Sequence, residues 1–74
     1  YGVTVNNVAP GAIETPRNAS VCADPIARGA VEACIPMGRF GTAEECADAV
    51  AFLVGESGKY ITGTDLIVDG GMRL

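Results

Sequence analysis

The stretch NNVAPGAIETP, from Asn6 to Pro16, holds the residues whose types and spacing best suit contact with a ligand. A strand-like run ends there in Pro10-Gly11, and Thr15 follows just before a second proline. Glycine lets a backbone come close to a ligand, and a threonine hydroxyl both donates and accepts hydrogen bonds. The other interpretation is a plain turn that ends a strand, and for this stretch in isolation it is favoured.

The thiols offer no second site. The three cysteines, Cys22, Cys34 and Cys46, match neither a disulfide framework nor a CxxC metal pattern. Histidine is absent, so a zinc ion would need carboxylates to complete its ligands. We therefore expect no metal site, and we interpret the cysteines as small apolar residues of a reduced, cytoplasmic protein.

Three other polar side chains are expected to have structural roles. Asn6 lies on an otherwise apolar strand, and we expect it to tie adjacent loops together through hydrogen bonds. Arg39 is either a solvated loop charge or the partner of a carboxylate such as Glu44 or Glu45. Asp69 has no support as an acid catalyst beyond being a carboxylate, so no catalytic residue is assigned.

The bulk composition argues against two classes of partner. The chain has 74 residues and a formal charge of −4, with five basic residues scattered singly along it. It has no basic stripe for nucleic acid and no basic amphipathic helix for a membrane surface. Because it begins at Tyr1 without methionine or a signal-peptide pattern, we expect a natural truncation, a processed product or a piece of a longer protein.

Two short strands are expected to position the turn, at residues 3–8 and 64–69. In the first, Val3 and Val5 alternate with polar residues, and Pro10-Gly11 ends the run. The second contains LIV, three consecutive apolar residues that are typical of a strand buried on both faces. Since helices connect the strands, we expect parallel neighbours in a sheet that needs further covering.

Two helices are expected between these strands, after a polar, irregular and mobile loop at residues 15–23. Asp24 is a good N-cap with Pro25 at the first helical position, and Pro36 stops that helix. The second helix, residues 42–55, begins with the capping box Thr42-x-x-Glu45. Its apolar stripe is expected to bury Cys46.

Three blocks in order along nearly the whole chain resemble the C-terminal part of the short-chain dehydrogenases/reductases (SDRs): GVTVNNVAPGAIETP, IPMGRFGTAEECADAVAFLVGES and YITGTDLIVDGGM. Within that family, PGAIETP and IPMGRFG most resemble glucose 1-dehydrogenases, while 3-oxoacyl-acyl-carrier-protein reductases share most of these blocks. The resemblance implies an α/β fold. The chain would be the C-terminal β-α-α-β portion of a Rossmann-like parallel sheet, incomplete on its own.

The resemblance also implies a role for residues 6–16 as a turn on the cofactor side, beside the nicotinamide of NAD or NADP. The cofactor-binding residues would be Pro10, Gly11, Ile13 and Thr15. Gly11 would let the backbone approach the cofactor, and the Ile13 backbone would pair with the carboxamide. The Thr15 hydroxyl would reach the carboxamide or the pyrophosphate, and residues 15–40 would form the substrate loop.

Two motifs of the family do not occur in these residues, the Gly-rich turn TGxxxGxG and the catalytic Tyr-x-x-x-Lys pair. Four positions after the tyrosines stand Val5 and Thr64, so the acid/base partner of hydride transfer is missing. The resemblance therefore implies part of an oxidoreductase that transfers hydride between nicotinamide and a small-molecule carbonyl or alcohol. We expect the chain alone to be inactive.

The alternative function is a non-catalytic, truncated assembly module. In the family, the last helix and the last strand commonly form a subunit interface. The resemblance thus implies a homo-oligomer, a dimer or a tetramer, whichever function holds.

Overall fold

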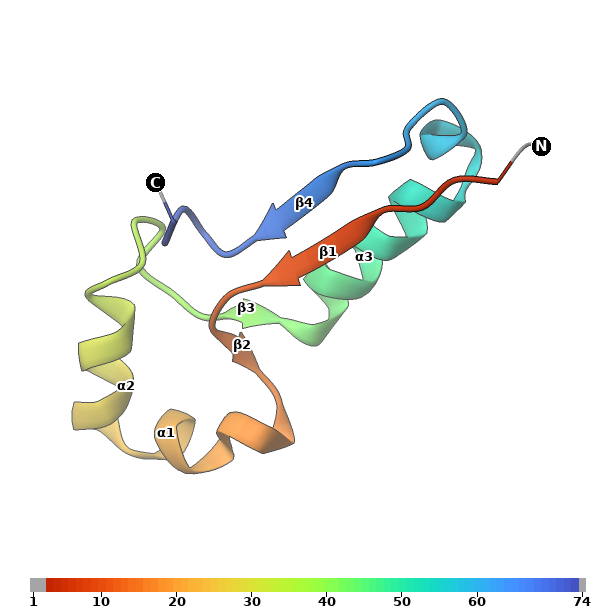
Figure 1. Ribbon diagram of the computed structural model, residues 1–74. Coiled ribbons are helices and arrows are strands. Elements are labelled where there is room, and N and C mark those ends of the chain that lie inside the picture. The colour runs from red at the N-terminus through yellow and green to blue at the C-terminus, as the bar shows by residue number, and fades with distance from the viewer. Residues whose placement is uncertain (1–2, 74) are drawn as a thin grey trace.

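The computed structural model describes residues 3–73 as an elongated α/β arrangement with extents of 49 × 25 × 15 Å. Strands β1 (Asn7–Pro10) and β4 (Asp65–Val68) lie side by side and parallel (Figure 1). Their register pairs Asn7 with Asp65 and Pro10 with Val68. The predicted parallel pairing is confirmed.

Strand β1 begins and ends later than the sequence predicted. Val3 and Val5 precede it and are 82% and 73% exposed, whereas Pro10 lies inside it. The N–H groups of Asn7 and Gly11 donate to carbonyls of the β4 side, at 2.9 and 3.0 Å. In a parallel ladder, the N–H groups of alternate residues point toward the partner strand. Pro10, which has no N–H, occupies one of the positions that point away from β4, so no ladder bond is lost.

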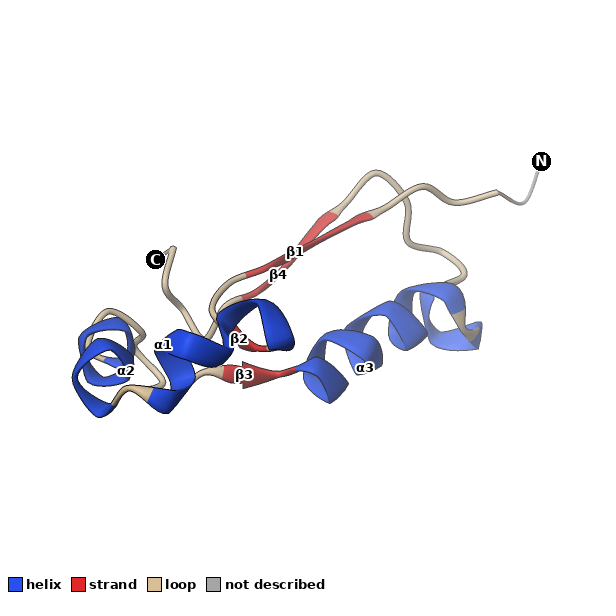
Figure 2. Ribbon diagram, turned by 90° about the horizontal axis from the view of Figure 1, so that it is seen from below, coloured by secondary structure: helices blue, strands red, loops and turns tan. Residues whose placement is uncertain are grey.

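Helix α3 (Ala43–Val54) covers one face of the β1–β4 pair (Figures 1 and 2). The predicted capping box is present, because the Glu45 N–H donates to Thr42 Oγ1 at 3.1 Å and the Thr42 N–H donates to Glu45 Oε1 at 2.9 Å. Leu53 is buried, but Cys46 is only half-buried, so the predicted burial of Cys46 was wrong. The helix is followed by a single 3-10 turn, η2 (Glu56–Gly58).

The face of the β1–β4 pair opposite α3 carries no helix or strand of residues 3–73 (Figure 2). Ile67 in the middle of β4 is therefore 49% exposed. Within residues 3–73 only one layer covers the sheet, as expected for a sheet that needs further covering, and burial of β4 on both faces stays a prediction.

Residues 13–41 form a second part of the molecule, which we call the clasp segment. It contains β2 (Ile13–Glu14), the 3-10 turn η1 (Pro16–Asn18) and helices α1 (Ala19–Ala23) and α2 (Pro25–Glu32). It ends at the first residue of β3 (Gly41–Thr42), which pairs with β2. The irregular loop expected at residues 15–23 was wrong, because η1 and α1 occupy it. The Asn18 side chain donates to the Ile13 carbonyl at 2.8 Å and turns the chain into α1.

Helix α2 has the predicted start. The Ile26 N–H donates to Asp24 Oδ1 at 3.0 Å, which makes Asp24 the N-cap, and Pro25 is the first helical residue. None of the residues of α2 is buried, and Ile26 is 84% exposed. The buried apolar side chains of the described residues are few: Ile13, Ile35, Phe40 and Leu53.

Candidate functional site

Gly11 lies where the carboxyl ends of β1 and β4 meet. A Cβ added to Gly11 would lie 2.5 Å from the Cβ of Asp69 and 2.9 Å from its Cα. Real Cβ atoms do not approach that closely, so glycine is required by the contact between the two strand ends. This reason differs from the one expected, the approach of a cofactor to the backbone.

The Asp69 carboxylate folds the chain back after β4. Its side chain is 6% exposed and accepts from the Gly71 N–H at 2.9 Å and from the Arg73 N–H at 3.1 Å. Both oxygens are therefore committed to backbone donors. That Asp69 has no catalytic role stays a prediction.

The backbone of Ile13 is oriented for contact with a ligand. The Gly41 N–H donates to the Ala12 carbonyl at 2.9 Å. In a parallel ladder with this bond, the following residue, Ile13, points its own N–H and C=O away from β3. The Ile13 carbonyl accepts from the Asn18 side chain, and its oxygen has a second lone pair. A carboxamide needs one donor and one acceptor at fixed geometry, and the Ile13 peptide groups fit that need.

Thr15 occupies the N-cap position of η1, yet its side chain makes no capping hydrogen bond. The turn is held instead by the Thr15 carbonyl, which accepts from the Asn18 N–H at 2.9 Å. The hydroxyl is thus not used by the turn that it precedes, and the role of Thr15 in cofactor binding stays a prediction.

A cavity of about 300 Å³ lies at the same end of β4 but has other walls. Arg39 and Glu45 line it on one side, and Ile67 to Gly71 line it on the other. None of Pro10, Gly11, Ile13 and Thr15 belongs to its lining. The four predicted site residues run from the last residue of β1 through β2 to the N-cap of η1, but within residues 3–73 they do not enclose a ligand.

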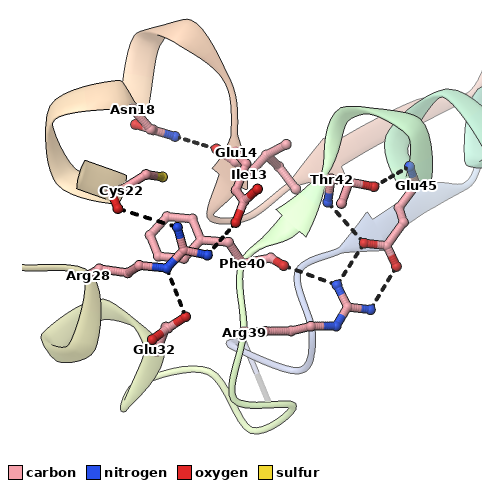
Figure 3. A network of polar contacts seen from close by, with 10 residues as sticks. All are labelled: Ile13, Glu14, Asn18, Cys22, Arg28, Glu32, Arg39, Phe40, Thr42 and Glu45. Carbon is pink, nitrogen blue, oxygen red and sulfur yellow. Dashed lines mark hydrogen bonds and ion pairs between the residues drawn. The ribbon is translucent and has the colours of Figure 1, made fainter. Parts of the chain in front are cut away.

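Arg28, which the sequence analysis did not single out, joins four parts of the clasp segment (Figure 3). Its guanidinium pairs with the Glu14 carboxylate and with Glu32 Oε2, the latter at 3.2 Å. It also donates to the Cys22 carbonyl at 3.4 Å and lies 5.1 Å from the centre of the Phe40 ring. The hydrogen bond that Arg28 donates to Glu14, and then the one that it donates to Glu32, raises the pKa of Arg28. The only sequence signal was the i,i+4 spacing of Arg28 and Glu32.

Arg39 forms a second charged cluster at the start of α3. Its guanidinium donates two parallel hydrogen bonds to the Glu45 carboxylate, at 2.8 and 2.9 Å, and another to the Phe40 carbonyl at 3.0 Å. The bonds from Arg39, followed by the Thr42 N–H, lower the pKa of Glu45 to about 2. Of the two carboxylates that the sequence offered, Glu45 is the partner.

Asn6 has the structural role that was predicted for it. Its side-chain amide donates to the Ile61 carbonyl at 3.2 Å, and its Oδ1 accepts from the Thr64 N–H at 3.1 Å. These bonds tie the approach to β1 to the approach to β4. Across residues 3–73, no three metal-binding side chains gather, and no helix is long and apolar enough to cross a membrane.

A family model described as enoyl-(acyl carrier protein) reductase, one of the SDRs, matches residues 1–73. The chain belongs to the SDR family. Over 73 residues it is 53% identical to 3beta-hydroxysteroid dehydrogenase 1 of Eggerthella lenta and 53% identical to glucose 1-dehydrogenase of Gluconobacter oxydans. These matches cover 99% of this SDR chain but only 28% and 27% of the relatives.

The fold agrees with that membership. A Pseudomonas aeruginosa structure titled RhlG/NADP active-site complex is 41% identical, with a TM-score of 0.87, over 96% of this chain and 29% of its own. The resemblance to the C-terminal part of a Rossmann-like SDR is confirmed. The preference for glucose 1-dehydrogenase is not exclusive, since a steroid dehydrogenase is equally identical.

Proposed function

We propose that the chain forms the cofactor-side turn, the substrate loop, the last helix and the last strand of an NAD(P)-dependent oxidoreductase. The reaction is hydride transfer between nicotinamide and a small-molecule carbonyl or alcohol. The orientation of Ile13 carries the proposal, because its peptide groups turn away from β3 at the carboxyl end of β1. In open α/β sheets, ligands bind beyond the carboxyl ends of the strands.

In this proposal each residue of the turn has a defined task toward NAD or NADP. The Ile13 N–H donates to the carboxamide oxygen, and the Ile13 carbonyl accepts from the carboxamide nitrogen. The Thr15 hydroxyl adds one hydrogen bond, while Pro10 and Gly11 let β1 end against Asp69. The bound nicotinamide supplies or accepts the hydride. As the family resemblance implies, the acid/base pair and the Gly-rich turn would come from outside this chain, which spans only 28% and 27% of these relatives.

The substrate side of the proposed site is formed by residues 15–40, with α1 and α2. The substrate class stays open between a sugar, as in glucose 1-dehydrogenase, and an acyl chain, as in 3-oxoacyl-acyl-carrier-protein reductase. Subunits assemble through α3 and β4. Val50, Phe52 and Ile67 support this assembly, since they are 46%, 48% and 49% exposed.

A graft tests the proposal. In the Gluconobacter oxydans glucose 1-dehydrogenase, the matched 73-residue segment is replaced by this chain, and the product is called the graft. We expect the graft to bind NADH or NADPH, followed by nicotinamide fluorescence, and to oxidise glucose. A folded graft with the parent's oligomeric state but no nicotinamide binding would overturn the proposal.

The same replacement in the Eggerthella lenta enzyme tests the substrate loop. If residues 15–40 select the substrate, the Eggerthella lenta enzyme that carries this chain should lose steroid turnover and keep nicotinamide binding. Undiminished steroid turnover would show that selection lies elsewhere.

A further inference from the structure

Arg28 has partners in every element of the clasp segment that faces it. Glu14 comes from β2, the Cys22 carbonyl from α1, Glu32 from α2 and the Phe40 ring from the approach to β3 (Figure 3). One side chain therefore connects four segments whose residues are otherwise mostly exposed.

We propose that Arg28 is a positioning residue: by holding Glu14, it fixes the cofactor-side turn against α1 and α2 and so couples the substrate loop to the nicotinamide contacts. The proposal rests on the proposed function. Glu14 stands between Ile13 and Thr15, so any shift of Glu14 moves both proposed contacts.

The local geometry of β2 explains why a side chain such as Arg28 is needed to hold Glu14. Side chains alternate across a strand, so Ile13 is buried at 6% exposure while Glu14 points outward to Arg28. The ladder between β2 and β3 is only two residues long on each strand. So short a ladder leaves the path after Glu14 to be set by other contacts.

Phe40 makes the clasp specific for arginine. Phe40 is 3% exposed, its ring lies under the Arg28 guanidinium, and its carbonyl accepts a hydrogen bond from Arg39. A planar guanidinium stacks on an aromatic face and still presents donors in its plane to two carboxylates. A lysine ammonium can pair with one carboxylate as a point charge, but it lacks the planar set of donors with which arginine binds two carboxylates at once.

Glu14 and Glu32, the two carboxylates that pair with Arg28, provide a matched comparison of cofactor KM in the graft. Arg28→Ala and Glu14→Gln should each raise the KM for the nicotinamide cofactor by about threefold to tenfold, with kcat changed less than twofold. Glu32→Gln removes the other ion pair of Arg28 without touching the turn, so it should lower the melting temperature and leave the cofactor KM unchanged. Arg28→Lys should restore part of the loss.

A double-mutant cycle tests whether Arg28 acts on the cofactor KM through Glu14. If Arg28 acts through Glu14, the combined variant raises the cofactor KM no more than either single variant does. Equal effects of Glu14→Gln and Glu32→Gln on KM, or a full effect of Arg28→Ala in the Glu14→Gln background, would overturn the proposal.

Hydrogen exchange separates failure of this proposal from failure of the proposed function. In a folded graft without activity, Arg28→Ala and Glu14→Gln should still speed amide exchange in the peptide spanning residues 13–18, and Glu32→Gln should not. Equal exchange in all variants would reject the clasp even if the graft is a good dehydrogenase. If Arg28→Ala fails to fold, Glu14→Gln and the charge-conserving Arg28→Lys give the same comparison.

Discussion

The sheet region, formed by β1, β4 and α3, and the clasp segment, residues 13–41, are held together by different interactions. The sheet region relies on a parallel ladder four residues long and on a helix that packs along it. The clasp segment relies on two arginines, Arg28 and Arg39, grouped around Phe40. Backbone hydrogen bonds join the strands of the first region, while charged side chains and the buried Ile13, Ile35 and Phe40 hold the second, so single substitutions should affect the two regions differently.

The strongest test asks whether the two regions together make a complete binding site. We expect the 74-residue chain alone to show no dehydrogenase activity and no appreciable binding of NADH or NADPH. Its turn offers a few hydrogen bonds worth roughly 0.5–1.5 kcal/mol each, whereas micromolar affinity needs about 8 kcal/mol. Fluorescence titration of the purified chain and an assay of glucose oxidation measure both. Micromolar binding would show that the clasp segment holds more of the site than we describe.

A second test acts where the two strand ends meet. Gly11→Ala places a Cβ 2.5 Å from that of Asp69 and should destabilise the graft by about 1–3 kcal/mol, measured by thermal unfolding. Gly29→Ala in α2 is the matched control, because an added Cβ there meets nothing within 4 Å. It should stabilise α2 by about 1 kcal/mol. Equal melting temperatures would mean that the strand ends can separate freely.

A third test measures how the melting temperature depends on pH, which reports on the Arg39–Glu45 ion pair. The pKa of Glu45 is lowered from 4.5 to about 2 by Arg39, so its stabilising contribution is complete above pH 4.5 and is lost as the pH falls toward 2. Glu45→Gln should flatten the decline in melting temperature over that range. Glu44→Gln, one residue earlier in the same first turn, is the control and should leave the decline in place.

The smallest expected effect belongs to the proposed nicotinamide contact of Thr15. In the graft, Thr15→Ala removes one hydroxyl contact worth about 0.5–1.5 kcal/mol, which corresponds to roughly a two- to tenfold rise in the cofactor KM. The fold should be undisturbed, because the hydroxyl makes no capping bond. Ser57→Ala, an exposed hydroxyl in η2, serves as control. An unchanged KM with both NADH and NADPH would argue against the contact.

Elements with local signals could be predicted from the sequence. The capping box of Thr42 and Glu45 and the N-cap at Asp24 involve residues within three positions, so their geometry follows from the chain alone. The apolar run in β4 and the helices before it indicated parallel pairing. The bounds of β1 were less accurate, because the ladder depends on which N–H groups face β4.

The sequence by itself determined the family, the helix caps at Asp24 and Thr42 and the parallel pairing of β1 with β4, since these depend on motifs or on neighbours along the chain. It did not predict β2, β3, η1 or α1. Only the tertiary structure decided what surrounds Gly11 and what Arg28 holds. Asp69 meets Gly11 across 58 positions, and Glu14 meets Arg28 across 14. Such contacts leave no periodic pattern, because they form only when separate segments have folded against one another.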